Sequence, residues 1–162
     1  MERKLRAILG RRGFRPTETR SRMMGAVRGR GNLSTEQRFR FALVRAGVSG
    51  WRLHPKRVAG RPDFYFESGR IAVFVDGCFW HGCPRCGHVP DKNRPFWTAK
   101  LTRNRERDRA AERVLRMGGV SVVRFWEHEL AESLPGCVRR LQQHLAHAKF
   151  GERSSRPIRQ LS

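Results

Sequence analysis

Residues 76–86 bring several chemically active groups into one short loop. The stretch Asp-Gly-Cys-Phe-Trp-His-Gly-Cys-Pro-Arg-Cys contains three thiols, one imidazole, one carboxylate and two large aromatic rings. Cys83 and Cys86 have the C-x-x-C spacing of zinc knuckles, and Cys78, five residues before Cys83, can add a third thiolate. In a chain whose cysteines stay reduced, this spacing predicts a structural zinc ion that stiffens the loop.

Zinc needs a fourth ligand, and two residues outside the loop could supply it. His128 follows the third predicted strand and is the favoured ligand. Cys137, on the last predicted helix, is the competitor, although a free buried cysteine is common without any metal. Four protein ligands leave no open position for catalysis, so we expect this zinc to be structural.

An aromatic pair, Phe79 and Trp80, lies between two of the predicted zinc ligands. Because zinc ligands on either side fix the backbone, the two rings cannot both turn into the core. At least one ring is therefore expected to face outward. Exposed rings beside arginines can stack on nucleic-acid bases or wedge between them. The alternative is that both are ordinary core residues, because most Phe and Trp side chains are buried.

Two carboxylates are expected to meet at neighbouring strand ends. An apolar run at 64–66, a Gly-containing turn at 67–70 and a second apolar run at 71–75 predict a β-hairpin. Asp63 opens the first strand and Asp76 closes the second, and in antiparallel strands these ends lie side by side. The two acids could share one cation, a layout typical of metal-dependent nucleases of the restriction-enzyme type.

His81 follows the aromatic pair and is free for acid–base chemistry if His128 binds the zinc. In restriction-type nucleases a lysine normally stands two residues after the second acid, and here that position is Cys78. We therefore expect His81 to deprotonate the attacking water, with a magnesium ion held by Asp63.

Hydrophobic periodicity predicts the elements that must position these groups. A capping pattern at Ser34 opens a helix that stops at Gly47, and Glu36 in its first turn suits the helix dipole. Together the predicted elements give an α/β fold, a restriction-endonuclease-like mixed sheet flanked by helices with a zinc loop. The other helices are expected over 97–117 and 136–149, and the strands over 51–58, 64–66, 71–75 and 120–126.

The long predicted helix carries polar residues on its inward face. Apolar positions recur every three or four residues along it, and Asn104 and Asp108 fall on the same face. An unpaired buried carboxylate is costly, so Asp108 should have a partner. A structural salt bridge and a functional contact explain this residue equally well.

The net charge predicts a polyanionic partner. The 162 residues include 35 Lys+Arg and 14 Asp+Glu, which gives a formal charge of +21. No apolar run is long enough to span a membrane and no export signal opens the chain, so nucleic acid is the expected partner. We expect one domain over 17–149, after a disordered basic arm at 1–16 and before a basic tail at 150–162.

Four stretches resemble the very-short-patch-repair (Vsr-type) mismatch endonucleases: Arg61–Asp63, Val73–Pro84, Asn104–Asp108 and Phe125–Glu129. With a further likeness near the N-terminus, the resemblance extends over roughly residues 17–145. It implies a magnesium-dependent endonuclease that nicks double-stranded DNA on the 5′ side of the thymine in a T·G mismatch. This lesion remains when 5-methylcytosine deaminates.

The resemblance also implies roles for the residues of the site. Asp63 and the backbone carbonyl of Val75 would hold magnesium, and His81 would be the catalytic histidine. Asp108 is a candidate to orient His81, and Glu36 matches another acidic position near the site. Asp76 stands where some members have a second active-site histidine, so it could bind metal here. The implied zinc ligands are Cys78, Cys83, Cys86 and His128.

Contacts with DNA follow from the same resemblance. Phe79, Trp80 and Trp97 would form an aromatic wedge that enters from the major groove. The segment 17–28, with Arg20, Arg22 and Met23, would close over the minor groove. A single-strand nick needs only a monomer, and the resemblance is compatible with further mismatch-repair proteins as partners in the cytoplasm of a bacterium, at the nucleoid.

Two other functions stay open at this stage. One is a nuclease of the same fold with another DNA target, such as a restriction enzyme. The other is a non-catalytic, zinc-containing nucleic-acid-binding protein, in which Asp63, Asp76 and His81 have structural roles.

Overall fold

The structure is a computed structural model that describes residues 33–154. The basic arm, the segment 17–28 with its expected DNA contacts Arg20, Arg22 and Met23, and the end of the basic tail lie outside the described residues. Within the described part, none of the helices has both the length and the apolar composition that crossing a bilayer requires.

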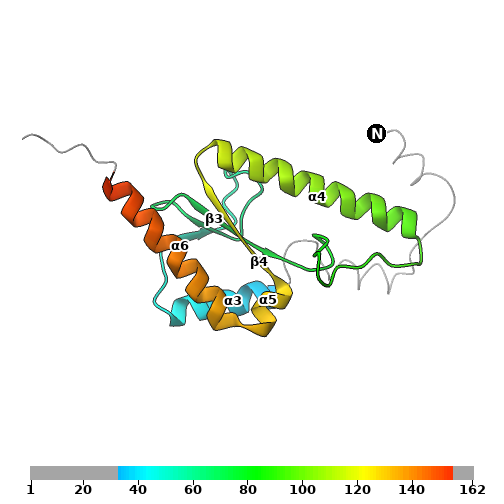
Figure 1. Ribbon diagram of the computed structural model, residues 1–162, viewed down its shortest axis with the longest axis horizontal. Helices are drawn as coiled ribbons and strands as arrows, with labels where there is room; N and C mark the ends of the chain where they lie inside the picture. The colour runs from blue at the N-terminus through cyan, green and yellow to red at the C-terminus, as the bar shows by residue number, and fades with distance from the viewer. Residues whose placement is uncertain (1–32, 155–162) are drawn as a thin grey trace, which may run out of the picture.

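A four-stranded mixed sheet with the order β1-β2-β3-β4 forms the centre of the molecule (Figure 1). β1 (Trp51–Leu53) pairs antiparallel with β2 (Phe64–Phe66), which pairs antiparallel with β3 (Ile71–Asp76). β3 runs parallel to β4 (Ser121–Trp126), so a crossover must join these two strands. The predicted hairpin and the predicted mixed α/β fold are confirmed.

Helices cover both faces of the sheet (Figure 1). α4 (Arg94–Met117) forms the crossover and lies along one face. α3 (Leu33–Arg45), the short α5 (Glu127–Glu132) and α6 (Leu134–Ser154) lie on the other. The sheet is therefore the middle of three layers, and its inner strand β3 is shielded from water on both sides.

β3 is buried along its whole length, as its near-continuous apolar sequence predicts. Alternate side chains of a strand point to opposite faces, and Ile71, Val73 and Val75 accordingly pack into the core beneath α3 and α6. Ala72 and Phe74 join a smaller cluster on the α4 side. The strand is thus held between two apolar layers, which gives its C-terminal end a rigid support.

The predicted strand at 51–58 is wrong beyond Leu53. His54 has a positive φ of 45°, and the Val58 N–H bonds to the Pro55 carbonyl, so the chain turns instead of extending. Pro55 also lacks the N–H that a strand ladder would need. The turn leaves room for His54 to face a neighbouring carboxylate.

β4 ends at Trp126, as predicted. Residues 127–129, for which no helix was predicted, form the first turn of α5. The Trp126 N–H donates to Glu129 Oε2 at 2.7 Å, which satisfies a backbone donor where the helix begins. α6 begins at Leu134, two residues earlier than predicted, and extends to Ser154.

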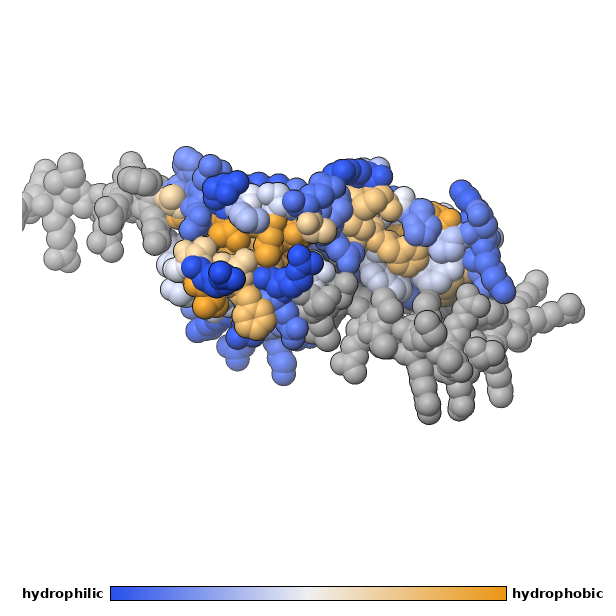
Figure 2. Space-filling view, turned by 90° about the horizontal axis from the view of Figure 1, so that it is seen from below, coloured by the Kyte–Doolittle hydropathy of each residue, from blue (hydrophilic) through white to orange (hydrophobic). Residues whose placement is uncertain are grey.

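The surface on the α3 side is mixed in character. Hydrophilic side chains surround smaller apolar patches on this face (Figure 2). Phe41 and Val44 of α3 are both more than half exposed. Scattered apolar residues of this kind are normal on a protein surface.

Candidate active site and metal centres

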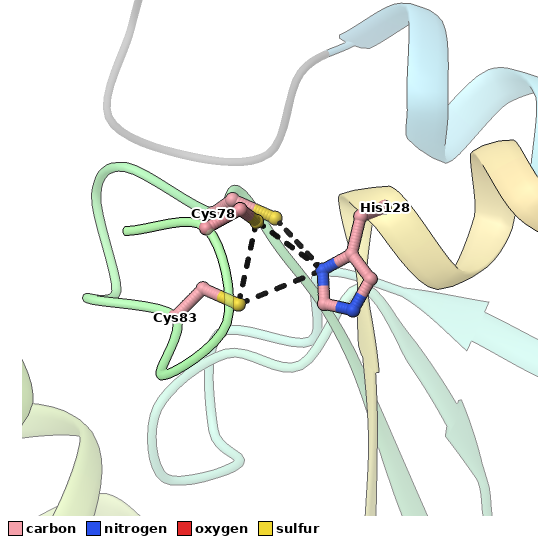
Figure 3. Close-up of side chains that lie close together, drawn as sticks. Cys78, Cys83 and His128 are labelled. Carbon is pink, nitrogen blue, oxygen red and sulfur yellow. Dashed lines mark hydrogen bonds between the residues drawn. The ribbon is translucent and has the colours of Figure 1, made fainter. Parts of the chain in front are cut away.

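Three thiols and one imidazole converge where β3 ends and α5 begins (Figure 3). The Sγ atom of Cys78 lies 3.2 Å from His128 Nδ1, and those of Cys83 and Cys86 each lie 3.5 Å from the same nitrogen. In tetrahedral zinc sites the bond lengths place sulfur and nitrogen ligands about 3.6 Å apart. The donor set and its spacing therefore fit a structural zinc ion.

The structure decides between the two candidates for the fourth ligand. His128 lies within the thiol cluster, at the first turn of α5. Cys137 is buried in the main core among apolar side chains and is not part of the cluster. Burial raises the pKa of the Cys137 thiol, as expected for a cysteine that packs as a small apolar residue.

Two tight turns bring the three thiols together. The Cys83 N–H donates to the Cys78 carbonyl, and the Gly87 N–H donates to the Cys83 carbonyl, both at 2.9 Å. A Cβ atom at Gly87 would lie 2.4 Å from the Cys83 carbonyl oxygen, so only glycine fits the second turn. The sequence of this loop thus encodes the ligand geometry locally.

His81 and Asp108 form a close polar pair in the site. His81 Nδ1 lies 2.6 Å from Asp108 Oδ2 on α4 and 3.6 Å from Asp76 Oδ1. Burial acts to lower the pKa of His81, but the hydrogen bond to Asp108 and the charges of both acids outweigh it and raise the pKa. The prediction that Asp108 points inward to a partner is confirmed, and the partner is His81.

A second ligand cluster consists of Glu36, His54 and Asp63, whose donor atoms all lie within 4.8 Å of one another. Glu36 Oε1 lies 3.0 Å from His54 Nε2, and Asp63 Oδ1 lies 3.7 Å from His54 Nδ1. The other Asp63 oxygen accepts a hydrogen bond from the Val75 N–H at 2.6 Å. Burial, together with the charge of Glu36, raises the pKa of Asp63 to about 6 despite that bond.

Those pKa effects describe a buried carboxylate whose charge the neighbouring His54 offsets only in part. A bound cation would offset the remainder, and carboxylate oxygens are the ligands that magnesium prefers. The residues around Asp63 therefore fit a divalent metal ion.

The positions of the strand ends predicted that Asp76 could share a cation with Asp63, but its partner in the structure is Arg124. Its carboxylate accepts a hydrogen bond from Arg124 at 2.5 Å, and its side chain is almost fully buried. Arg124 comes from β4, opposite Phe74 of β3, and stacks over the Phe74 ring. Asp76 therefore lies next to the Glu36–His54–Asp63 cluster but outside it.

One cavity of about 490 Å³ joins these groups. Its polar lining consists of three acids, two imidazoles and three arginines, which are Asp63, Asp76, Asp108, His54, His81, Arg61, Arg107 and Arg124. A base, a candidate metal site and a cation thus face one space. This arrangement can hydrolyse a phosphodiester.

Sequence reasoning missed His54 and Arg124. Arg124 could have been identified, because it is a charged residue inside the apolar run Val-Val-Arg-Phe-Trp. An arginine in a buried strand needs an anionic partner, so this pattern indicates an ion pair. His54 gave no comparable signal, because its position depends on the turn after β1.

The aromatic residues form a cluster beside the cavity. The ring of Phe79 lies 5.0 Å from that of Trp80 and 5.3 Å from that of Trp97, and all three are half-buried. Lys100 Nζ lies 5.0 Å above the Trp80 ring. The Asn104 amide donates to the Trp80 carbonyl at 3.1 Å, so α4 holds the loop that carries the rings.

Comparison with known proteins agrees with this arrangement. The family model described as "DNA mismatch endonuclease Vsr" matches residues 12–86. The type II nicking enzyme V.NaeI of Lentzea aerocolonigenes is 39% identical over 132 residues, which cover 79% of each chain. V.XorIIP, a type II nicking enzyme of Xanthomonas oryzae pv. oryzae, is 38% identical over 71% of this chain and 84% of its own.

The DNA mismatch endonuclease Vsr of Escherichia coli (strain K12) is a further relative. It is 35% identical over 111 residues, which cover 67% of this chain and 69% of that protein. Several relatives are thus matched over more than two thirds of their length. The chain therefore belongs to the Vsr family of DNA mismatch endonucleases and is a Vsr-like nicking endonuclease that acts on DNA.

Proposed function

We propose that this enzyme nicks one strand of double-stranded DNA on the 5′ side of the thymine in a T·G mismatch. The nick would start very short patch repair of deaminated 5-methylcytosine. The observation that carries the proposal is the aromatic cluster of Phe79, Trp80 and Trp97 beside the His81–Asp108 pair. One structural unit thus presents rings that can enter a stack of nucleobases. Next to these rings it holds an imidazole that can activate water as a general base.

Selectivity for a mismatch follows from the energy of unstacking. A mismatched step is easier to open than a paired one, so an aromatic wedge distorts it at lower free energy. The charge of +21 would supply affinity for any DNA, since contacts to phosphate are independent of sequence. We expect the aromatic wedge to discriminate between mismatched and matched DNA, and the basic residues to bind the phosphates. Arg20 and Arg22 are among these basic residues, and with Met23 they belong to the segment that would close over the minor groove.

His81 is the proposed general base. Its Nδ1–H donates to Asp108, which leaves Nε2 without a proton and available to accept one from the attacking water. Asp108 holds the ring in this tautomer and stabilises the imidazolium that forms. Asp76, paired with Arg124, lies 3.6 Å from the same Nδ1 and adds a second negative charge on that side of the ring.

Asp63, together with the Val75 carbonyl, is the proposed holder of magnesium, with Glu36 beside it. A magnesium ion there would stabilise the negative charge that develops on the phosphate. Asp63 is fixed by the Val75 N–H, so its free oxygen is directed toward the cavity that His81 also lines. The chain's own residues thus place the metal site and the base on one side of the phosphate.

Zinc is the proposed occupant of the cluster formed by Cys78, Cys83, Cys86 and His128. Its role would be to fix the loop that carries Phe79, Trp80 and His81. A single-strand nick requires one catalytic site, so we propose a monomer that acts at the nucleoid in the bacterial cytoplasm. Other mismatch-repair proteins are proposed as partners in the later steps of repair.

A nicking assay tests this proposal. Heteroduplexes labelled on either strand and carrying one T·G pair are incubated with zinc-loaded enzyme and magnesium, beside matched duplexes and a reaction with EDTA. We expect one product cut 5′ of the thymine, no product with EDTA, and none from an Asp63→Ala variant that still binds DNA. Equal cutting of matched and mismatched duplexes would indicate a nuclease with another target. An inactive wild type that binds DNA would indicate a binding protein.

A further inference from the structure

We propose that His54 supplies an imidazole nitrogen to the divalent-metal site, which it forms together with Glu36 and Asp63. The inference rests on the proposed function, because it concerns the same metal site, and it assigns a ligand that the sequence analysis did not identify. Its consequence is a preference between two metal ions. An imidazole nitrogen is a poorer ligand for Mg²⁺ than for the transition-metal ion Mn²⁺, so this site should favour Mn²⁺ over Mg²⁺ more than a site made of oxygen ligands alone.

The fold brings the three side chains together from separate elements. Glu36 belongs to the first turn of α3, His54 follows β1 and Asp63 precedes β2. Leu53 pairs with Phe64 in the antiparallel ladder, so the next residues outward, His54 and Asp63, lie opposite each other. The His54 N–H donates to the Asp63 carbonyl at 3.4 Å, which continues the pairing by one step.

The donor atoms have the spacing of ligands to a single ion. With bonds of 2.0–2.1 Å to magnesium, adjacent ligands of an octahedron lie about 3 Å apart. Glu36 Oε1 lies 3.0 Å from His54 Nε2, and the ligand atoms of Glu36, His54 and Asp63, one from each residue, all lie within 4.8 Å of one another. Together with the Val75 carbonyl, these three ligands would still leave two of the six positions of an octahedron open toward the cavity, as a catalytic site requires.

The electrostatic surroundings also favour a cation. Among the described residues, no arginine or lysine forms an ion pair with Glu36 or Asp63, and His54 is their partner instead. Neighbouring Asp76, by contrast, is paired with Arg124. In a protein with 35 Lys+Arg, two buried acids without a permanent positive partner leave a place for a metal ion.

The backbone of His54 is held in an uncommon conformation. Its φ of 45° lies in the left-handed region, which costs a residue other than glycine on the order of 1 kcal/mol or more. His54 is also the most exposed of the three ligands, with 38% of its side chain accessible against 11% and 13% for the acids. An ion entering from solvent would therefore meet the imidazole at the mouth of the cluster.

The test measures ligation directly, with Mn²⁺ as the probe. Full-length protein is loaded with one equivalent of zinc, and Mn²⁺ binding is titrated by the loss of the EPR signal of free Mn²⁺. Pulsed EPR then detects ¹⁴N nuclei bound directly to the ion. The key variant is His54→Asn, because asparagine tolerates a left-handed backbone and removes the imidazole. His144→Asn, at an exposed position on α6, is the matched control.

We expect ¹⁴N coupling in the wild type and in His144→Asn, and its loss in His54→Asn. His54→Asn should also bind Mn²⁺ about tenfold more weakly, with a smaller change for Mg²⁺. Persistence of the ¹⁴N coupling in His54→Asn, with an unchanged melting temperature, would overturn the assignment.

An Asp63→Asn variant separates the failure of this inference from the failure of the proposed function. If Asp63→Asn loses Mn²⁺ while His54→Asn keeps both the affinity and the ¹⁴N coupling, the proposed metal site stands and His54 is not its ligand. If Asp63→Asn also binds Mn²⁺ normally, the metal site of the proposed function is wrong, and the role of His54 fails with it.

Discussion

The thiol cluster and the acidic cluster lie near the same end of the sheet, but they are built in opposite ways. The thiol cluster, Cys78, Cys83, Cys86 and His128, takes three ligands from one loop and surrounds its centre with four protein donors. The acidic cluster, Glu36, His54 and Asp63, takes one ligand from each of three segments and opens on a cavity. Zinc prefers the first kind of ligand and magnesium or manganese the second.

This difference assigns separate roles to the two clusters, because one can stiffen the loop and the other can bind a metal ion that takes part in the reaction. The closed cluster can only hold the loop, because it has no free position for substrate. The open cluster can hold a metal ion beside His81, because its protein ligands do not complete the six positions of an octahedron. β3 links them, since Cys78 follows its end and its Val75 N–H fixes Asp63.

The largest effect should come from opening the closed cluster. Cys83→Ser removes a central ligand, and because metal affinity contributes directly to the folding of such a loop, zinc and nicking should both be lost. Metal analysis, thermal melting and the nicking assay measure the three consequences. The matched control is Cys137→Ala, which should keep its zinc and lose only a little stability. A Cys83→Ser protein with full zinc and full activity would refute the structural role.

Removing the base should affect chemistry and leave the closed cluster intact. His81→Ala should lower the single-turnover nicking rate by about 10²–10⁴-fold, the usual contribution of a general base. Zinc content and affinity for mismatched DNA should stay at wild-type values, as should all properties of His147→Ala, an exposed histidine on α6. A variant of His81 that nicks at the normal rate would exclude it as the base.

Removing the carboxylate behind the base should have a smaller effect with a defined pH dependence. Asp108 helps to raise the pKa of His81, and the base must be unprotonated to act, so wild-type activity should rise with pH around a midpoint above 6.5. In Asp108→Asn this midpoint should move to lower pH, and the maximal rate should fall on the order of 10- to 100-fold. A pH profile that stays in place or moves upward would contradict the assignment.

The smallest effect should be the pH dependence of metal stabilisation at the open cluster. The pKa of Asp63 is raised from 3.8 to about 6, so below pH 6 a proton competes with the cation, and above it the carboxylate is free. Apparent metal affinity should fall about tenfold per pH unit below 6. The rise in melting temperature caused by Mg²⁺ or Mn²⁺ should therefore be a few degrees at pH 7.5 and close to zero at pH 5.

The raised pKa of Asp63 also affects how the stability of the metal-free protein depends on pH. Since the folded pKa of Asp63 lies above its unfolded value, protonation favours the folded state. This contribution is complete below about pH 4 and is lost as the pH rises through 6. Asp63→Asn should remove it. A metal effect of equal size at both pH values would show that Asp63 does not bind the ion.

Features encoded by nearby residues could be predicted from the sequence. The hairpin over β2 and β3 follows from two apolar runs and a turn, and the thiol cluster follows from the cysteine spacing. The inward position of Asp108 follows from the period of a single helix. In each case the pattern lies within one element or one loop.

Features that depend on distant segments could not be predicted in the same way. The neighbouring strand ends suggested that Asp63 and Asp76 share a cation, but Arg124 arrives from β4 and pairs with Asp76. His54 depends on a turn that ends β1 early. The sequence analysis found which groups are present in the site, and the fold decides which of them face each other.

The uninterrupted course of α4 has a consequence for where the DNA is cut. This one helix carries Trp97 of the aromatic cluster and Asp108 behind the base, eleven residues apart, or about 16 Å along its axis. In the proposed mechanism, a rigid rod of this kind would fix the offset between the opened base step and the broken bond. Changing the length of the loop before the helix should leave the cleavage position on the strand unchanged, whereas inserting a full turn between the two residues should shift or abolish it.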